Sequence, residues 1–181
     1  MDSSKPMFLD IETNGLDPDT IWVAVTMQDG VVQEHYTSES LTQALAGKFK
    51  VVGHNLIGFD MPVLWKLWNI HVDKSRIEDT LVMSRLSNPS REGGHRLSNW
   101  GEILNFPKGD YNDWSCLTPE MVKYCIQDVK VTAKAYDKLK LELRKFSKES
   151  IDLEHDVQHI IQKQTKNGSV SYTHLTLPTT D

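Results

Sequence analysis

Phe8-Leu9-Asp10-Ile11-Glu12-Thr13-Asn14-Gly15, near the start of a chain of 181 residues, is an apolar segment that carries two acidic residues and runs into a turn. Side chains two residues apart on a strand point to the same face, so a strand here would project Asp10 and Glu12 together. Strand interiors disfavour Asp, and two buried like charges cost several kcal/mol unless a cation neutralises them. The alternative is a strand that ends at Leu9 and leaves both carboxylates in solvent. The apolar residues before the pair favour a functional site at the end of a buried strand.

The segments that follow predict a sheet flanked by helices. Strand patterns occur at residues 7–11, 21–27 and 51–53, and another extended segment follows the turn at Asp29-Gly30. Helical spacing of apolar residues occurs at 41–49, 61–68, 79–86, 96–104, 118–146 and 151–166. Residues 87–95 are loop-like, and residues 105–117 give no clear pattern. Strands followed by alternating strands and helices predict an α/β domain with a mixed sheet.

The length of the chain allows one well-cored domain with a short addition. Its last predicted helix ends at Asn167-Gly168, a typical C-terminal cap. Residues 169–181 follow without periodicity, and we interpret them as a non-native tail.

The composition is that of a globular protein, with 39% apolar and 25% charged residues. No apolar run approaches the roughly 18 residues of a membrane span, and the N-terminus lacks a signal-peptide pattern. Cys116 and Cys125 have no metal-type spacing and fit unpaired thiols in a reducing compartment. We therefore expect a cytoplasmic protein that does not contact a membrane.

The formal net charge of −5 argues against binding nucleic acid through a basic surface. A cluster of acidic residues that loads divalent cations would remove this objection, because the bound ions then face the phosphates.

Two later segments add carboxylates to the first pair. In His54-Asn55-Leu56-Ile57-Gly58-Phe59-Asp60, Asp60 follows a short strand and is either a site residue or the cap of the next helix. In Tyr124-Cys125-Ile126-Gln127-Asp128, a spacing of four places Tyr124 and Asp128 on one face of a helix. Taken alone, Asp128 is a weak signal, because an Asp on the exposed face of an amphipathic helix is the usual explanation.

In this order, the three acidic segments resemble the three motifs of the DEDD exonuclease superfamily, and Tyr124 resembles its tyrosine subclass. The segments 79–86, 94–101 and 124–132 are also similar to the 3′→5′ proofreading domain of family A DNA polymerases, most of all those of short-tailed phages. The resemblance implies a ribonuclease H-like fold, a mixed five-stranded sheet flanked by helices. It further implies an exonuclease domain at residues 1–146 and, at 147–168, the helix that begins a polymerase portion.

Four carboxylates suit hard cations, Mg²⁺ or Mn²⁺, better than zinc. The resemblance implies two such ions, which activate a water and stabilise the departing 3′ oxygen. It implies that Asp10 bridges both ions, that Glu12 and Asp128 complete one site, and that Asp60 holds the second ion through water. Tyr124 would orient the attacking water.

The same resemblance points to a substrate, the 3′ end of single-stranded DNA, cut to 5′-mononucleotides by a domain that is a monomer in isolation. In the phage case the location would be the host cytoplasm. Leu16 matches a position that wedges between the last bases, and Thr13 one whose backbone contacts the terminal nucleotide. Phe59 and Lys108 could contact the strand or have ordinary packing and surface roles. The candidate substrate-binding residues are Thr13, Leu16, His54, Asn55 and Phe59.

Two other functions stay open at this point. One is a free-standing nuclease of the same superfamily that acts on RNA, because the motifs do not read the sugar. The other is an inert module of the same fold that binds nucleic acid or a partner, although the presence of all four carboxylates argues against it.

Overall fold

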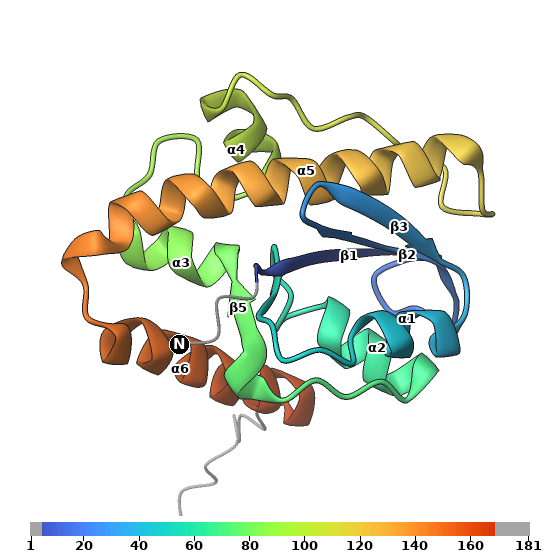
Figure 1. The fold of residues 1–181 in the computed structure, drawn as a ribbon, viewed down its shortest axis with the longest axis horizontal. Helices are drawn as coiled ribbons and strands as arrows, with labels where there is room; N and C mark the ends of the chain where they lie inside the picture. Colours follow the sequence, from blue (N-terminus) through green and yellow to red (C-terminus); the bar gives the residue numbers. More distant parts are fainter. Residues whose placement is uncertain (1–4, 169–181) are drawn as a thin grey trace, which may run out of the picture.

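The computed structural model describes residues 5–168, which form a five-stranded sheet with helices packed on it (Figure 1). The strands are β1 (Met7–Thr13), β2 (Ile21–Gln28), β3 (Val31–His35), β4 (Val51–Gly53) and β5 (Ile77–Asp79). Their order across the sheet is β3-β2-β1-β4-β5. β1 lies antiparallel to β2 and parallel to β4, so the sheet is mixed, as predicted.

The first three strands form a meander. Asp29 and Gly30 both have positive φ, 53° and 78°, which gives the tight turn between β2 and β3 the backbone of a favoured hairpin. The central strand β1 pairs with β2 from Phe8 to Thr13 but with β4 only at Met7 and Phe8.

Within residues 5–168, six α-helices connect and cover the strands: α1 (Ser38–Ala44), α2 (Asp60–Trp68), α3 (Thr80–Ser87), α4 (Leu97–Ile103), α5 (Pro119–Glu142) and α6 (Lys148–Asn167). The long helix α5 begins as the sequence predicts, because Thr118 is its cap and its hydroxyl accepts the Met121 N–H at 3.1 Å. α5 packs on β1 and β2, with α3 and α4 beside it, whereas α1 and α2 lie on the other side of the sheet (Figure 1).

Two apolar layers hold the sheet between these helices. Leu9 and Ile11 of β1 join one buried cluster with residues of α1 and α2, such as Leu41 and Leu64. Phe8 faces the other way and packs edge-on against Tyr136 of α5, with ring centroids 5.6 Å apart. Because side chains alternate along a strand, Asp10 and Glu12 point to the same side as Phe8, toward α5.

The structure departs from the sequence prediction at a few points. β5 was not expected from the pattern, because its three residues are too short to show a periodicity. α1 and α6 each begin three residues earlier than predicted, after the capping residues Thr37 and Ser147. β1 continues to Thr13, so the alternative of a strand ending at Leu9 is wrong.

The division near residue 146 stays a prediction; α6 follows it and packs on α3. The proposed tail, 169–181, lies outside the described residues. Within residues 5–168, no helix combines the length and the apolar character needed to cross a membrane.

Candidate active site

Strand β1 carries the first two carboxylates on the face that α5 covers. Asp10 is partly exposed and Glu12 is buried, at 6% exposure. Both are held by a strand whose backbone pairs with β2 from Phe8 to Thr13. The two carboxylates therefore have a rigid support.

Asp60, the first residue of α2, approaches from the end of β4. Its Oδ1 accepts the backbone N–H of Ile11 at 3.2 Å, beyond the point where the β1–β4 pairing stops. The carboxylate is almost completely buried, at 4% exposure. The cap of α2 is Phe59, so the alternative role of Asp60 as the helix cap is wrong.

Asp128 reaches the same place from α5. Its Oδ2 accepts a hydrogen bond from Lys108 Nζ in an ion pair, and its side chain is 5% exposed. The other oxygen, Oδ1, is buried and has no hydrogen-bond partner among the described residues. A buried carboxylate oxygen without a partner is costly, which indicates that something else normally contacts it.

The four carboxylates affect one another's ionisation and so form one electrostatic group. Burial, with a further contribution from Asp128, raises the pKa of Asp10 to about 7. Burial and the charges of Asp10 and Asp128 raise the pKa of Glu12 to about 10.

The pKa of Asp60 is also raised, by burial and then by Asp10. For Asp128, burial raises the pKa against the opposing effect of Lys108. The raised pKa values mean that the four carboxyl groups tend to keep their protons. A bound multivalent cation would remove the repulsion between their negative charges.

Lys108 comes from the segment 105–117, which shows no clear pattern of apolar residues. Its Nζ lies 4.4 Å from the centre of the Tyr124 ring. Although burial lowers it, the ion pair with Asp128 holds the pKa of Lys108 above its usual range. Lys108 is therefore a fixed positive charge inside the acidic group.

Tyr124 lies one helical turn before Asp128 and belongs to an aromatic cluster. The rings of Tyr111 and Trp114 lie 5.8 Å from its ring, centroid to centroid. Trp22 of β2 fixes the position of this loop by donating its Nε1–H to the Trp114 carbonyl at 3.1 Å. Burial raises the pKa of Tyr124, so the phenol stays protonated near neutral pH and acts as a donor.

The turn at His54-Asn55 depends on a carboxylate that the sequence prediction missed. Asp79 accepts the N–H groups of Asn55 at 2.9 Å, Ile57 at 3.0 Å and Leu81 at 2.9 Å. Asn55 itself has a left-handed φ of 63°. The fully satisfied, buried Asp79 shapes the turn that leads to Asp60 and is structural.

His54 is neutral in this setting. Thr80 donates its hydroxyl to the Gly53 carbonyl at 3.1 Å, so Nδ1–H of His54 donates to the Thr80 oxygen at 2.8 Å. Burial and the charge of Lys108 lower the pKa of His54 to about 4. These bonds fit a residue that orders the turn.

The other candidate substrate residues surround the carboxylates differently. Leu16 is 95% exposed, as a side chain that wedges between bases would have to be. Thr13 is buried and donates its hydroxyl to the Gly15 carbonyl at 2.9 Å. Phe59 is half-buried and packs against the core. Its contact with a nucleic-acid strand stays a prediction.

The donor set fits hard divalent ions. One ligand atom from each of Asp10, Glu12 and Cys125 lies within 4.8 Å of the other two. Asp128 adds a buried carboxylate oxygen that has no hydrogen-bond partner among the described residues. Carboxylate oxygens dominate, as in sites for Mg²⁺ or Mn²⁺. Cys125 is the unexpected member, because its position between Tyr124 and Asp128 gave no signal in the sequence.

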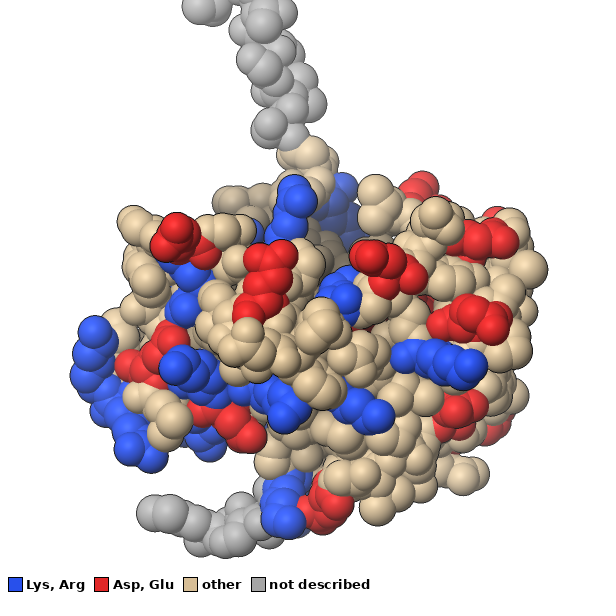
Figure 2. Space-filling model, turned by 90° about the horizontal axis from the view of Figure 1, so that it is seen from above, with Lys and Arg blue, Asp and Glu red and all other residues tan. Residues whose placement is uncertain are grey.

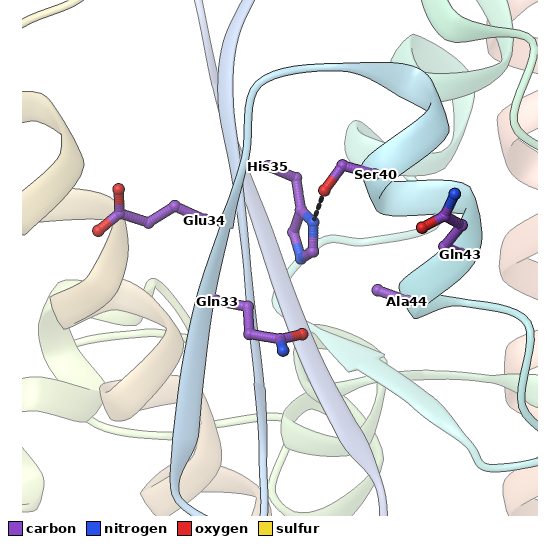
Figure 3. A pocket seen from close by; sticks show the side chains of 6 residues that line it. All are labelled: Gln33, Glu34, His35, Ser40, Gln43 and Ala44. Carbon is purple, nitrogen blue, oxygen red and sulfur yellow. Dashed lines mark hydrogen bonds between the residues drawn. The ribbon is translucent and has the colours of Figure 1, made fainter.

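The hollows elsewhere on the surface do not compete with this site. One of about 530 Å³ lies between β3 and α1, lined by residues such as Gln33, His35 and Ser40 (Figure 3). There both ring nitrogens of His35 are occupied, Nε2 by Thr26 and Nδ1 by Ser40, each at 2.8 Å. That histidine is structural, and the hollow holds no acidic cluster.

The fold matches solved nuclease structures. NrnC of Brucella melitensis aligns with a TM-score of 0.73 and 19% identity, over 95% of this chain and 92% of that one. A structure of the same protein contains bound Mg²⁺. RNase D of Escherichia coli aligns with a TM-score of 0.69 and 15% identity, over 90% of this chain and 46% of that one. The predicted ribonuclease H-like fold is confirmed.

In sequence, the chain is similar to the DNA-directed DNA polymerases of Escherichia phage T7 and Enterobacteria phage T3. Each is 27% identical over 176 aligned positions, which cover 65% of this chain and 25% of the relative. No family model matches.

With the fold, this similarity supports the predicted resemblance to 3′→5′ exonucleases of the DEDD type. The particular resemblance to phage DNA polymerases is likewise confirmed. The chain spans about a quarter of the length of these curated relatives.

Proposed function

We propose that this chain is the 3′→5′ proofreading domain of a phage-type family A DNA polymerase, which removes nucleotides from the 3′ end of DNA and releases 5′-mononucleotides. The observation that carries the proposal is the single acidic group formed by Asp10, Glu12, Asp60 and Asp128. The sequence similarity to two phage DNA polymerases supports DNA as the substrate.

We assign two divalent ions, Mg²⁺ or Mn²⁺, to these carboxylates. Asp10 would contribute to both, Glu12 and Asp128 to one, and Asp60 to the other. When bound, the ions lower the pKa of a water and stabilise charge on the departing oxygen. The unpartnered Oδ1 of Asp128 and the raised pKa values of Asp10 and Glu12 support this assignment.

The chain's own groups position the reaction. Tyr124, protonated and one turn from Asp128, donates its hydroxyl hydrogen bond toward the attacking water. Lys108 supplies positive charge next to the phosphate that is cut. The exposed Leu16 and the turn at His54-Asn55 contact the last nucleotides, with Thr13 and Phe59 beside them.

The proposed continuation into a polymerase has support in α6. Its outer side exposes an apolar stripe of Leu153, Val157, Ile160 and Ile161. These residues recur at helical spacing on the side opposite the buried His155. Such a stripe is typical of a contact surface, and a following polymerase portion would cover it.

RNA is the second candidate substrate. The matching RNase D is described as an exoribonuclease involved in structured RNA processing, and NrnC has been solved bound to pGG. Because the carboxylates act on the phosphate, they do not distinguish the two sugars. Bases of either nucleic acid could also stack on Tyr111 and Trp114 of the loop at 105–117.

A direct test uses DNA and RNA of one sequence, each labelled at its 5′ end, with Mg²⁺ or Mn²⁺. The proposal expects a ladder of DNA that shortens from its 3′ end and releases mononucleotides, and no degradation when a chelator is added. The Asp60→Ala variant serves as the control for contaminating nuclease. A strong preference for RNA would replace DNA as the substrate, and no turnover of either by folded protein would defeat the proposal.

A further inference from the structure

A cysteine thiol is built into the acidic site. Cys125 of α5 is completely buried, and its Sγ lies 3.4 Å from Asp10 Oδ2 and 3.6 Å from the Asp10 carbonyl oxygen. The thiol, Asp10 and Glu12 present three potential ligand atoms within 4.8 Å of one another. A single ion could therefore contact all three with small adjustments.

A buried free cysteine usually serves as a small apolar side chain, and Cys125 does pack near Val129. A second observation separates it from that ordinary role. Asp128, three residues further on the same helix face, keeps its buried Oδ1 without a hydrogen-bond partner among the described residues. The charge of Asp128 also acts on Asp10, Glu12 and Cys125, so an ion bound by those three residues would lie within the field of this carboxylate.

The separation of sulfur and oxygen suits a tetrahedral ion. Zinc bonds of about 2.3 Å to sulfur and about 2.1 Å to oxygen separate the two ligands by roughly 3.6 Å in a tetrahedron. The separation of Cys125 Sγ from Asp10 Oδ2 is 3.4 Å. Thiolate is a soft ligand that favours zinc and similar ions, whereas Mg²⁺ prefers oxygen.

We propose that Asp10, Glu12 and Cys125 form a site for zinc or another thiophilic divalent ion. When the ion binds, the thiol releases its proton to solvent and a metal–sulfur bond forms. The site uses carboxylates that the proposed function assigns to Mg²⁺ or Mn²⁺, so the inference rests on that function for the identity of the competing ions. A thiophilic ion bound there displaces the hard ions and blocks hydrolysis.

Cd²⁺ titrated into the whole chain, without other divalent ions, tests the site directly. Cadmium bound to a thiolate gives a charge-transfer absorption in the ultraviolet, which needs no substrate and no activity. We expect one strongly bound Cd²⁺ per chain, with this absorption, and its displacement by Zn²⁺.

The two cysteines supply a matched pair of variants, because Cys116 is exposed and Cys125 is buried. Cys116→Ser should keep the absorption. Cys125→Ser should lose it and bind Cd²⁺ at least about 100-fold more weakly, since a direct ligand matters more than the outer partners whose loss costs about 10- to 100-fold. Cys125→Ala, closer to the thiol in its apolar packing, repeats the measurement should the serine variant unfold, with circular dichroism as the check.

Three results would overturn the inference. The unsubstituted chain could lack the absorption, the Cys125 variants could keep it, or Cys116→Ser could lose it. DNA hydrolysis with Mg²⁺ is measured in parallel. If hydrolysis occurs and the absorption does not, the thiophilic site alone is wrong. If both fail, the proposed function falls as well.

Discussion

Asp10 and Glu12 lie two residues apart on β1, and burial together with neighbouring carboxylates raises the pKa of both. A carboxyl group whose pKa is raised on folding holds its proton in the folded chain at a pH where the unfolded chain has lost it. The folded chain then binds more protons, so the free energy of unfolding falls as pH rises between the two pKa values. For Asp10 that interval runs from 3.8 to about 7.

The first prediction concerns this pH dependence. Without divalent ions, Asp10→Asn should be more stable than the unsubstituted chain, by about 1 kcal/mol or more near neutral pH. The difference should grow from pH 5 to pH 7, because over that range the folded chain must keep a proton on Asp10 that the unfolded chain has lost, and Asn binds no such proton. Denaturant unfolding in a chelating buffer measures it, and a constant or shrinking difference would contradict the account.

The second prediction concerns activity. Asp10→Ala should reduce release of 3′ nucleotides by at least about 1,000-fold, because it removes a ligand assigned to both ions. Tyr124→Phe should lose only about 10- to 100-fold, since it removes one hydrogen bond that orients the water. Single-turnover rates with Mg²⁺ give both values, with circular dichroism as the check on folding. Normal cleavage by Asp10→Ala would show that the site is elsewhere.

Single residues of the site differ in how far the sequence could identify them. Asp10 and Glu12 are predictable because a strand places residues i and i+2 together. Asp79 and Cys125 were missed, because nothing in the chain near them shows that one holds a distant turn and the other touches Asp10. Such contacts are made only by the tertiary fold.

At the scale of elements, predictability followed local signals. α5 was predicted from its cap, proline and long periodicity, and β4 from a buried apolar run. β5 has only three residues, and its pairing with β4 is set by the sheet rather than by its own pattern. The loop at 105–117 has no repeating pattern, because its place is fixed by side chains such as Trp22 and Lys108.

The third prediction concerns this loop. Lys108→Gln should increase Mn²⁺ affinity, roughly threefold to tenfold, because the lysine competes with the ion for Asp128. Calorimetric titration with Mn²⁺ measures the affinity. The control for total charge is Lys130→Gln, which changes an exposed lysine of α5. Equal or weaker binding by Lys108→Gln than by the control would contradict the role given to Lys108.

The helix α6 is attached to the site through one histidine. His155 donates Nδ1–H to the Ile151 carbonyl at 2.8 Å, so its Nε2 accepts the Asp79 N–H at 2.9 Å. Asp79 in turn holds the turn at His54-Asn55. The helix beyond residue 147 therefore supports the site indirectly.

The fourth prediction tests that link. His155→Ala should lower the free energy of unfolding by about 1–3 kcal/mol, because the buried Asp79 N–H loses its acceptor. Denaturant unfolding measures the change, and Glu154→Ala, at an exposed position beside it, is the control. Equal stability of the two variants would show that α6 is not held through this bond.

For the molecule as a whole, the distribution of charge points to a dependence on cations. Lys and Arg are intermixed with Asp and Glu over the face seen in Figure 2, so this face offers no broad basic surface for phosphates. The formal net charge is −5, and two divalent ions would bring it close to neutral. Nucleic acid should therefore be held mainly where the ions are.

The central claim is that Asp10, Glu12, Asp60 and Asp128 jointly bind two hard cations. Anomalous diffraction from crystals grown with Mn²⁺ and a mononucleotide tests it most directly. The account predicts two manganese peaks about 4 Å apart, in contact with these four side chains. Manganese bound away from them, or no manganese in crystals where the four carboxylates are ordered, would contradict it.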